Sequence, residues 1–424
     1  MQKKSPGPRS FNRSRVIILF ILFVAGGRHL AARKIDVGNS FSFTTIKSAL
    51  AEAVKGDTVI VHGGEYREGN IIIDKSITLI GLDWPVLDGE KKYEVVSIKA
   101  NHVLLTGFKI LRSGIASLED PCGVKVYDSW YVNIIGNEVQ DAFFGIYLQY
   151  SHHCIIKDNH IVASGVEEQE IGNGIHCWKS DSLQIIGNRI SGHRDGIYFE
   201  FVTGSVIWRN ISTHNVRYGL HFMFSNDDAY ITNIFRQNGA GVAVMFTKRV
   251  KMFNNFFEDN WGDAAYGLLL KEISDSYILH NTFKGNTSGI YMEGTNRIEV
   301  EENSFINNGW GMKIQASCMD NVIRRNNFLS NTFDVSTNGS LVLNKFDENY
   351  WDKYEGYDLN RDNTGDVPYR PLSIFSMIVE QNPPAMLLFR SFIVTLLDRS
   401  EKIIPTLTPD NFIDHSPRMH ALSL

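Results

Sequence analysis

The sequence predicts an all-β fold, a right-handed parallel β-helix in which coils of about 22 residues stack on one another. The first observation is a repeated unit, glycine followed by apolar, variable and apolar residues. The second is an asparagine at a constant distance after each glycine, and the third is a composition with 35 Gly and only 11 Pro, typical of many turns with positive φ. The repeated glycines are Gly123, Gly145, Gly174, Gly196, Gly219, Gly241, Gly267, Gly289 and Gly311.

The spacing of these units is that of a solenoid. Successive glycines are 22, 29, 22, 23, 22, 26, 22 and 22 residues apart, one period with two small insertions. Leucine-rich repeats share this length but need a Leu-x-x-Leu-x-Leu frame, which is absent. The asparagines, which we expect to satisfy backbone groups at the corners, are Asn137, Asn159, Asn188, Asn210, Asn233, Asn255, Asn281, Asn303 and Asn326.

Three segments are expected along the chain. Residues 1–32 read as a signal peptide, because a basic start precedes the uncharged apolar run Val16–Ala25, which is too short for a comfortable membrane span. Residues 33–351 form the β-helix, with irregular early coils between Gly56 and Gly114. Residues 352–424 form an extension without the repeat that carries most of the prolines.

Both ends of the solenoid need caps, because open sheet edges invite aggregation. An amphipathic helix over 44–54, with Thr44 as a possible N-cap, is expected to cover the first coil. A second helix is expected to start at Pro383-Pro384 and to present a wide apolar face. This face either packs back on the solenoid or docks on a membrane-protein partner; its chief residues are Met386, Leu387, Phe389, Phe392, Ile393 and Leu396.

Composition and charge narrow the functional classes. A hydrophobic content of 43% and a charged content of 21% exclude wholesale disorder. The formal net charge of -5 gives no global attraction to nucleic acid or to an anionic membrane. No second apolar stretch has spanning length, so we expect a soluble or peripheral protein outside the cytoplasm.

Strand alternation predicts which side chains face outward, and it groups soft metal ligands there. Residues two and four positions after each glycine point out, which places His221 beside Met223 on one strand and Met245 one coil further along. Thioethers select Cu(I), so these three residues are a candidate for a shallow, exchangeable copper site. The alternative is that the tail or an insertion covers this face and the methionines simply pack there.

Two other metal or redox signals are weaker. The run Asp358-x-Asn360-x-Asp362-x-Thr364-x-Asp366 is similar to the start of a calcium loop, but Asn363 replaces the expected glycine and Tyr369 the final glutamate. An Asx-turn-rich loop is the favoured reading of that segment. Of the four cysteines, Cys122 and Cys318 lie eight coils apart and cannot pair, and most are expected to be buried thiols.

An enzymatic alternative also follows from the fold. Many parallel β-helices act on acidic polysaccharides, with clustered carboxylates and a basic residue, so a polysaccharide lyase or hydrolase is the rival hypothesis. The outward columns offer isolated acids, and the nearest approach is Arg194 beside Asp195, which an ordinary surface ion pair also explains. We therefore expect no enzymatic activity.

Several longer runs resemble one family. The chain from about Gly56 to Pro409 closely resembles NosD, the family of periplasmic maturation proteins of nitrous-oxide reductase. The tail is the specific part, since other β-helix proteins share only the glycine and asparagine periods. The runs that carry the resemblance are 218–227, 238–246, 259–262, 266–270, 349–358, 365–371 and 376–389.

This resemblance implies a role in denitrification. It implies a β-helix subunit mounted in the periplasm on an ABC transporter made of an ATPase and a permease. The complex would work with a copper chaperone lipoprotein to assemble the copper centres of nitrous-oxide reductase. The apolar tail would then dock on the permease, and His221, Met223 and Met245 would act as a transient Cu(I) relay, in the manner of a metallochaperone.

Overall fold

The computed structural model describes residues 32–115, 120–164, 168–262, 265–339, 343–403 and 412–424. Residues 33–424 form one compact unit. The expected signal peptide lies outside the described residues, apart from Ala32.

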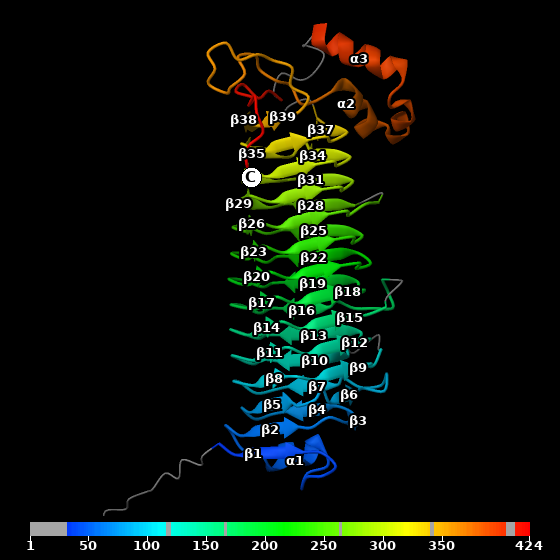
Figure 1. Ribbon diagram of the computed structural model, residues 1–424, viewed down its shortest axis with the longest axis vertical. Coiled ribbons are helices and arrows are strands. Elements are labelled where there is room, and N and C mark those ends of the chain that lie inside the picture. The colour runs from blue at the N-terminus through cyan, green and yellow to red at the C-terminus, as the bar shows by residue number, and fades with distance from the viewer. Residues whose placement is uncertain (1–31, 116–119, 165–167, 263–264, 340–342, 404–411) are drawn as a thin grey trace, which may run out of the picture. The chain divides into compact units, whose positions relative to one another are not determined.

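Three parallel sheets run along this unit, and successive coils add one strand to each (Figure 1). The 14-stranded sheet contains β1 (Lys34–Val37), β2 (Thr58–Val61), β5 (Thr78–Gly81), β8 (Leu104–Thr106), β11 (Asn133–Ile135), β14 (Ile155–Lys157), β17 (Gln184–Ile186), β20 (Val206–Trp208), β23 (Ala229–Ile231), β26 (Lys251–Phe253), β29 (Ser274–Leu279), β32 (Asn296–Glu301), β35 (Met319–Arg324) and β38 (Leu343–Asp347).

The repeated glycine units form strands of the 12-stranded sheet, from Gly123 in its third strand to Gly311 in its eleventh. It contains β4 (Ile71–Ile73), β7 (Val96–Ile98), β10 (Cys122–Tyr127), β13 (Phe144–Gln149), β16 (Ile175–Trp178), β19 (Asp195–Glu200), β22 (Tyr218–Met223), β25 (Ala240–Met245), β28 (Tyr266–Lys271), β31 (Ser288–Glu293), β34 (Trp310–Ile314) and β37 (Phe333–Ser336).

The 13-stranded sheet closes each coil. It contains β3 (Glu65–Tyr66), β6 (Val86–Asp88), β9 (Lys109–Leu111), β12 (Glu138–Gln140), β15 (His160–Val162), β18 (Arg189–Ser191), β21 (Ile211–Thr213), β24 (Ile234–Arg236), β27 (Phe256–Glu258), β30 (Thr282–Lys284), β33 (Ser304–Ile306), β36 (Asn327–Leu329) and β39 (Tyr350–Trp351). The predicted all-β, right-handed parallel β-helix is therefore confirmed.

Side chains one and three positions after each glycine fill the interior. In β19 these are Ile197 and Phe199, both without exposed surface. One column of the 13-stranded sheet is a continuous aromatic stack with ring centroids 4.2 to 5.6 Å apart, close to the spacing of paired strands. The stack consists of Phe235, Phe257, Phe283, Phe305, Phe328 and Trp351.

Asparagine ladders hold the corners between coils. Each backbone N–H and side-chain amide of one asparagine donates to the Oδ1 of the next, as Asn210 does to Asn233 at 2.9 and 3.1 Å. The same amide also donates to the carbonyl of Ile185 in the preceding coil at 2.7 Å. Because this corner is buried, every rung satisfies backbone groups that water cannot reach.

A second ladder, which the sequence reading missed, runs along another corner. Its rungs are Asn215, Asn238, Asn260, Asn286, Asn308 and Asn331. His193 occupies the position before the first rung, and its backbone N–H donates to Asn215 Oδ1 at 3.1 Å. Its ring is fully buried, and neither ring nitrogen has a hydrogen-bond partner.

The repeated glycines are required by close approach rather than by positive φ. A Cβ on Gly241 would lie 2.3 Å from the carbonyl oxygen of Gly267 in the next coil. The left-handed corner positions are filled mainly by other residues, such as Phe224 with φ 51° and Phe246 with φ 54°. The glycine period therefore marks the place where adjacent coils come closest.

The N-terminal cap is a short helix, α1 (Ile46–Glu52). Its N-cap is Thr45, whose side chain accepts a hydrogen bond from the Ser48 N–H, so the expected N-cap at Thr44 is one residue early. Ile46, Ala49 and Leu50 are buried against the first coils.

The C-terminal extension contains α2 (Ile374–Gln381), the 3₁₀ helix η1 (Pro383–Leu388) and α3 (Phe392–Ile403). The single helix expected from Pro383 onward is thus two elements, because the chain breaks at Arg390, where φ is 64°. Phe375 and Val379 of α2 pack with Phe333 of β37, so α2 covers the last coil. Lys313 of β34 also pairs with Glu380 at 2.9 Å.

The last described segment closes the asparagine ladder. Asp414 Oδ2 accepts hydrogen bonds from the backbone and side-chain nitrogens of Asn349 and from the indole N–H of Trp351, each at 3.0 Å. Phe412 is fully buried in the solenoid core. The C-terminus is therefore part of the β-helix fold.

Candidate functional site

The candidate site lies on the outer face of the 12-stranded sheet, on strands β16, β19, β22 and β25. Met223 of β22 and Met245 of β25 are register partners, and His221 pairs with Ala243. Because all three predicted residues lie in the outward phase of two adjacent strands, the sheet brings the two thioethers and the imidazole to one patch. Met223 Sδ already accepts a hydrogen bond from the Tyr198 hydroxyl at 3.7 Å.

His221 is more buried than its outward phase suggests. Only 6% of the residue is exposed, because Tyr198 and Tyr218 pack on its ring at centroid distances of 5.0 and 4.9 Å. Its Nδ1 lies 3.2 Å from Arg217 Nη2 and 3.5 Å from Asp195 Oδ2. Its Nε2 is buried and has no hydrogen-bond partner.

Asp195 and Arg217 form a buried ion pair beside this histidine. Arg217 donates from Nε and Nη2 to the two carboxylate oxygens at 2.9 and 2.6 Å, and the Tyr218 N–H donates to Oδ1 at 3.2 Å. Burial raises the pKa of Asp195, but the hydrogen bonds from His221 and Arg217 outweigh it and the pKa is lowered. Asp195 therefore stays ionised.

Sequence reasoning named Asp195 but mispaired it. Arg194, its chain neighbour, lies 3.9 Å away, whereas the close partner is Arg217 of the next coil, and the carboxylate has no exposed surface. The signal that could have found this pair is the period: Asp195 and Tyr218 occupy the same position before their glycines, which places Arg217 directly above Arg194. A surface ion pair is thus the wrong description.

An aromatic column extends the site toward the N-terminus. The ring of His176 lies 4.3 Å from that of Tyr147 and 4.8 Å from that of Tyr198, measured between centroids. Burial, followed by the charge of Arg194, lowers the pKa of His176 to about 3, so this imidazole is neutral. Asn173 Nδ2 lies 2.9 Å from its Nδ1, and Asn173 Oδ1 is buried without a partner.

An insertion reaches the edge of the patch. Glu168, which follows β15, lies with its carboxylate 3.9 Å from Arg217 Nη1. The insertion thus reaches Arg217, and Met223 and Met245 remain partly exposed.

The predicted docking residues of the tail are all exposed. Of η1 and α3, Leu387 is 90% and Phe392 is 80% exposed, and Met386, Phe389, Ile393 and Leu396 each expose more than a third of their surface. Val394, on the other side of α3, is buried with the α2 cluster. The extension therefore packs one side on the last coil and leaves an apolar side uncovered.

The acidic loop uses its oxygens internally. Asp358 accepts from the backbone N–H groups of Asp362 and Asn363, and Asp362 accepts from that of Thr364. The Asx turns favoured by the sequence are present here.

The cysteines are four buried free thiols. Burial raises the pKa of Cys154 to about 11 and that of Cys177 still further. The thiols of Cys154 and Cys177 are therefore protonated at neutral pH, where neither is a reactive thiolate.

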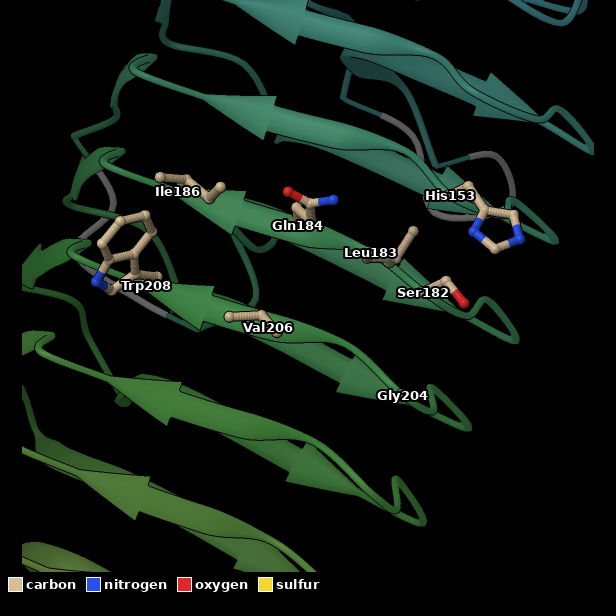
Figure 2. A pocket seen from close by; sticks show the side chains of 8 residues that line it. All are labelled: His153, Ser182, Leu183, Gln184, Ile186, Gly204, Val206 and Trp208. Atoms are coloured by element: carbon tan, nitrogen blue, oxygen red, sulfur yellow. The ribbon is translucent and has the colours of Figure 1, made fainter.

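A shallow pocket of about 350 Å³ lies on the outer face of the 14-stranded sheet, and Figure 2 shows the side chains that line it. It is lined by His153, Ser182, Leu183, Gln184, Ile186, Gly204, Val206 and Trp208. None of these side chains is a carboxylate, so the pocket lacks the acid pair that glycoside hydrolysis needs.

Across the described ranges, no group of three or more His, Cys, Asp or Glu side chains is placed to hold a metal ion. Met223 and Met245 are register partners on adjacent strands, and the Nε2 atom of His221 has no hydrogen-bond partner among the described residues. No helix within the same ranges is long and apolar enough to cross a membrane.

Comparison with known proteins shows a similarity to NosD proteins. Residues 161–357 match the family model described as periplasmic copper-binding protein (NosD). The chain is 28% identical over 374 residues to the probable ABC transporter binding protein NosD of Pseudomonas aeruginosa, covering 83% of this chain and 86% of that protein. The chain is similar to NosD proteins over most of its length.

The matched region of the NosD family model contains the candidate patch, since residues 161–357 include β16 to β25. The family description supports a periplasmic, copper-related accessory role, and the name of the Pseudomonas aeruginosa relative supports an association with an ABC transporter.

Solved structures show the same fold at low identity. The catalytic unit of an α-1,3-glucanase from Streptomyces thermodiastaticus is 13% identical, with a TM-score of 0.56, covering 72% of this chain and 65% of that one. The AlgE6 A-module of a mannuronan C-5 epimerase from Azotobacter vinelandii is 14% identical, with a TM-score of 0.52, covering 72% and 87%. At such identities the likeness shows the β-helix alone.

Proposed function

We propose that the chain is the periplasmic accessory subunit of an ABC transporter complex and handles Cu(I) for the copper centres of nitrous-oxide reductase. Cu(I) would arrive from a copper chaperone lipoprotein and leave toward the reductase, with no chemical conversion on this chain. The observation that carries the proposal is the register pairing of Met223 with Met245 beside His221. Two thioethers and one imidazole suit a soft cation that must be released again.

The proposal also assigns the parts of the chain. Residues 1–32 would direct export and be removed, residues 33–351 would form the scaffold that carries the copper patch, and residues 352–424 would cap it and contact the permease. The exposed apolar side of η1 and α3 supports the last assignment, because uncovered apolar patches of this kind mark interaction sites.

A test of copper handling measures the product of the pathway. Strains in which His221, Met223 and Met245 are all alanine should yield reductase with a reduced copper content per polypeptide, measured by mass spectrometry of the purified metal. Met319→Ala is the matched control, because this methionine is 41% exposed on another sheet. Full copper loading in the triple variant would contradict the proposal.

Docking is tested by point variants rather than by deletion of the tail. Removing residues 383–424 would also remove Phe412 and Asp414, which belong to the solenoid core. Leu387→Ser combined with Phe392→Ser should abolish co-purification of the ATPase and permease without changing the melting temperature. Leu359→Ser, an equally exposed leucine of the extension, is the control; retention of the transporter by the double variant would refute the docking assignment.

A further inference from the structure

The Nδ1 atom of His221 faces two groups with opposite hydrogen-bonding character. Arg217 Nη2 lies 3.2 Å away, and Asp195 Oδ2 lies 3.5 Å away. A guanidinium can only donate, whereas an ionised carboxylate can only accept. The two neighbours therefore favour different tautomers of the same imidazole.

The tautomer decides what Nε2 can do. If Nδ1 accepts from Arg217, the proton of the neutral ring sits on Nε2, which then has no lone pair for a metal. If Nδ1–H donates to Asp195, Nε2 carries the lone pair. Because Nε2 is buried and has no partner in the protein, a bound cation would be its only acceptor of that lone pair.

We propose that Asp195 is a positioning residue for Cu(I), holding His221 with Nδ1 protonated so that Nε2 can ligate, and that Arg217 opposes it. This inference rests on the copper patch proposed above. Carboxylates in this role raise the basicity of a ligating histidine and fix its ring. Hydrogen-bond donation from Arg217 lowers the Cu(I) affinity, which suits a cation that must be released to the next protein.

The geometry supports this role for Asp195. The carboxylate has no exposed surface and is fixed by both nitrogens of Arg217 and by the Tyr218 N–H. Arg217 in turn stacks on the ring of Tyr218 with its guanidinium carbon 5.0 Å from the centroid. Asp195 therefore cannot turn away from His221 without losing these contacts.

The test is the Cu(I) affinity of the purified full-length chain, measured by competition with a chromophoric Cu(I) chelator. Asp195→Asn should weaken binding by roughly 10- to 100-fold, the usual effect of removing such a partner. Arg217→Leu, which adds no metal ligand, should tighten it by roughly five-fold, because one opposing hydrogen bond is lost. A loss of folding stability cannot produce the tighter binding, so the pair of variants separates positioning from structural damage.

The control is Asp88→Asn, because Asp88 is an equally buried carboxylate paired with Arg112 but has no histidine beside it. It should leave Cu(I) affinity unchanged. X-ray absorption of the Asp195→Asn copper complex should also show loss of the imidazole scattering, which a purely structural role would not remove.

The outcomes distinguish the two proposals. If His221→Ala leaves the Cu(I) affinity unchanged, the copper patch itself is wrong. If His221→Ala weakens binding but Asp195→Asn does not, or Arg217→Leu fails to tighten it, the copper patch stands and the positioning role is overturned. In the His221→Ala background, Asp195→Asn should have no further effect, and an additional loss there would also overturn it.

Discussion

Replacing His193 with asparagine is predicted to stabilise the β-helix, and more so at acidic pH. His193 precedes the first rung of the second ladder, where its backbone N–H donates to Asn215 Oδ1 but its ring donates to nothing. In later rungs the asparagine side chain also donates to the next Oδ1, as Asn215 does to Asn238 at 2.8 Å. The variant should gain this bond, worth about 1 kcal/mol.

The pH dependence follows from burial. Burial lowers the pKa of His193 to about 4, against 6.5 for the ordinary side chain, and the nearby Gly172 carbonyl only partly compensates. Between these values the unfolded chain binds a proton that the folded chain does not, so stability falls as pH drops from 6.5 toward 4. The loss is about 2 kcal/mol at pH 5 and nearly zero at pH 7.5.

The assay is thermal unfolding of both proteins at pH 7.5 and pH 5. Buried groups other than His193, such as His176, titrate in both proteins and cancel in the comparison. The variant's advantage in melting temperature should therefore widen at pH 5. His214→Asn, at an exposed position one coil along, is the control and should show no widening. An equal response of His193→Asn and the unchanged protein would refute the reasoning.

Two further predictions concern the core and its C-terminal closure. Phe305→Ala should lower the free energy of unfolding by about 3–5 kcal/mol, because it opens a gap in the aromatic stack between Phe283 and Phe328. A decrease of less than about 1 kcal/mol in a urea titration would contradict this. Asp414→Ala should lower the free energy of unfolding by about 1–3 kcal/mol for each buried donor that it leaves unpaired at Asn349 and Trp351. Hydrogen exchange should then rise at residues 349–351, and unchanged protection there would show that the C-terminus does not close the ladder.

The regular coils could be predicted because each contact recurs. A glycine, two inward apolar residues and an asparagine reappear with one phase, so the first ladder and the buried columns follow from the sequence alone. The second ladder was equally predictable but was overlooked, because Asn215 and its successors each stand five residues after an asparagine of the first ladder, from Asn210 to Asn326. The reason for the repeated glycines could not be predicted, because close approach between coils depends on the stacking of neighbouring coils.

The site was predictable only in part. The alternation of side chains along each strand placed Met223, Met245 and His221 on one outer face. It does not predict how far side chains of adjacent coils bury a residue on that face. The burial of His221 and the pairing of Asp195 with Arg217 depend on side-chain direction across coils. The break at Arg390 was also hidden, because the apolar pattern continues through it.

The central claim is that soft sulfur on the outer face binds Cu(I). The most direct measurement is X-ray absorption at the copper edge of the purified chain loaded with one equivalent of Cu(I). We predict two sulfur scatterers and one imidazole nitrogen, with the sulfur signal lost in the Met223→Ala, Met245→Ala double variant. A spectrum with no sulfur, or one that the double variant leaves unchanged, would contradict the account.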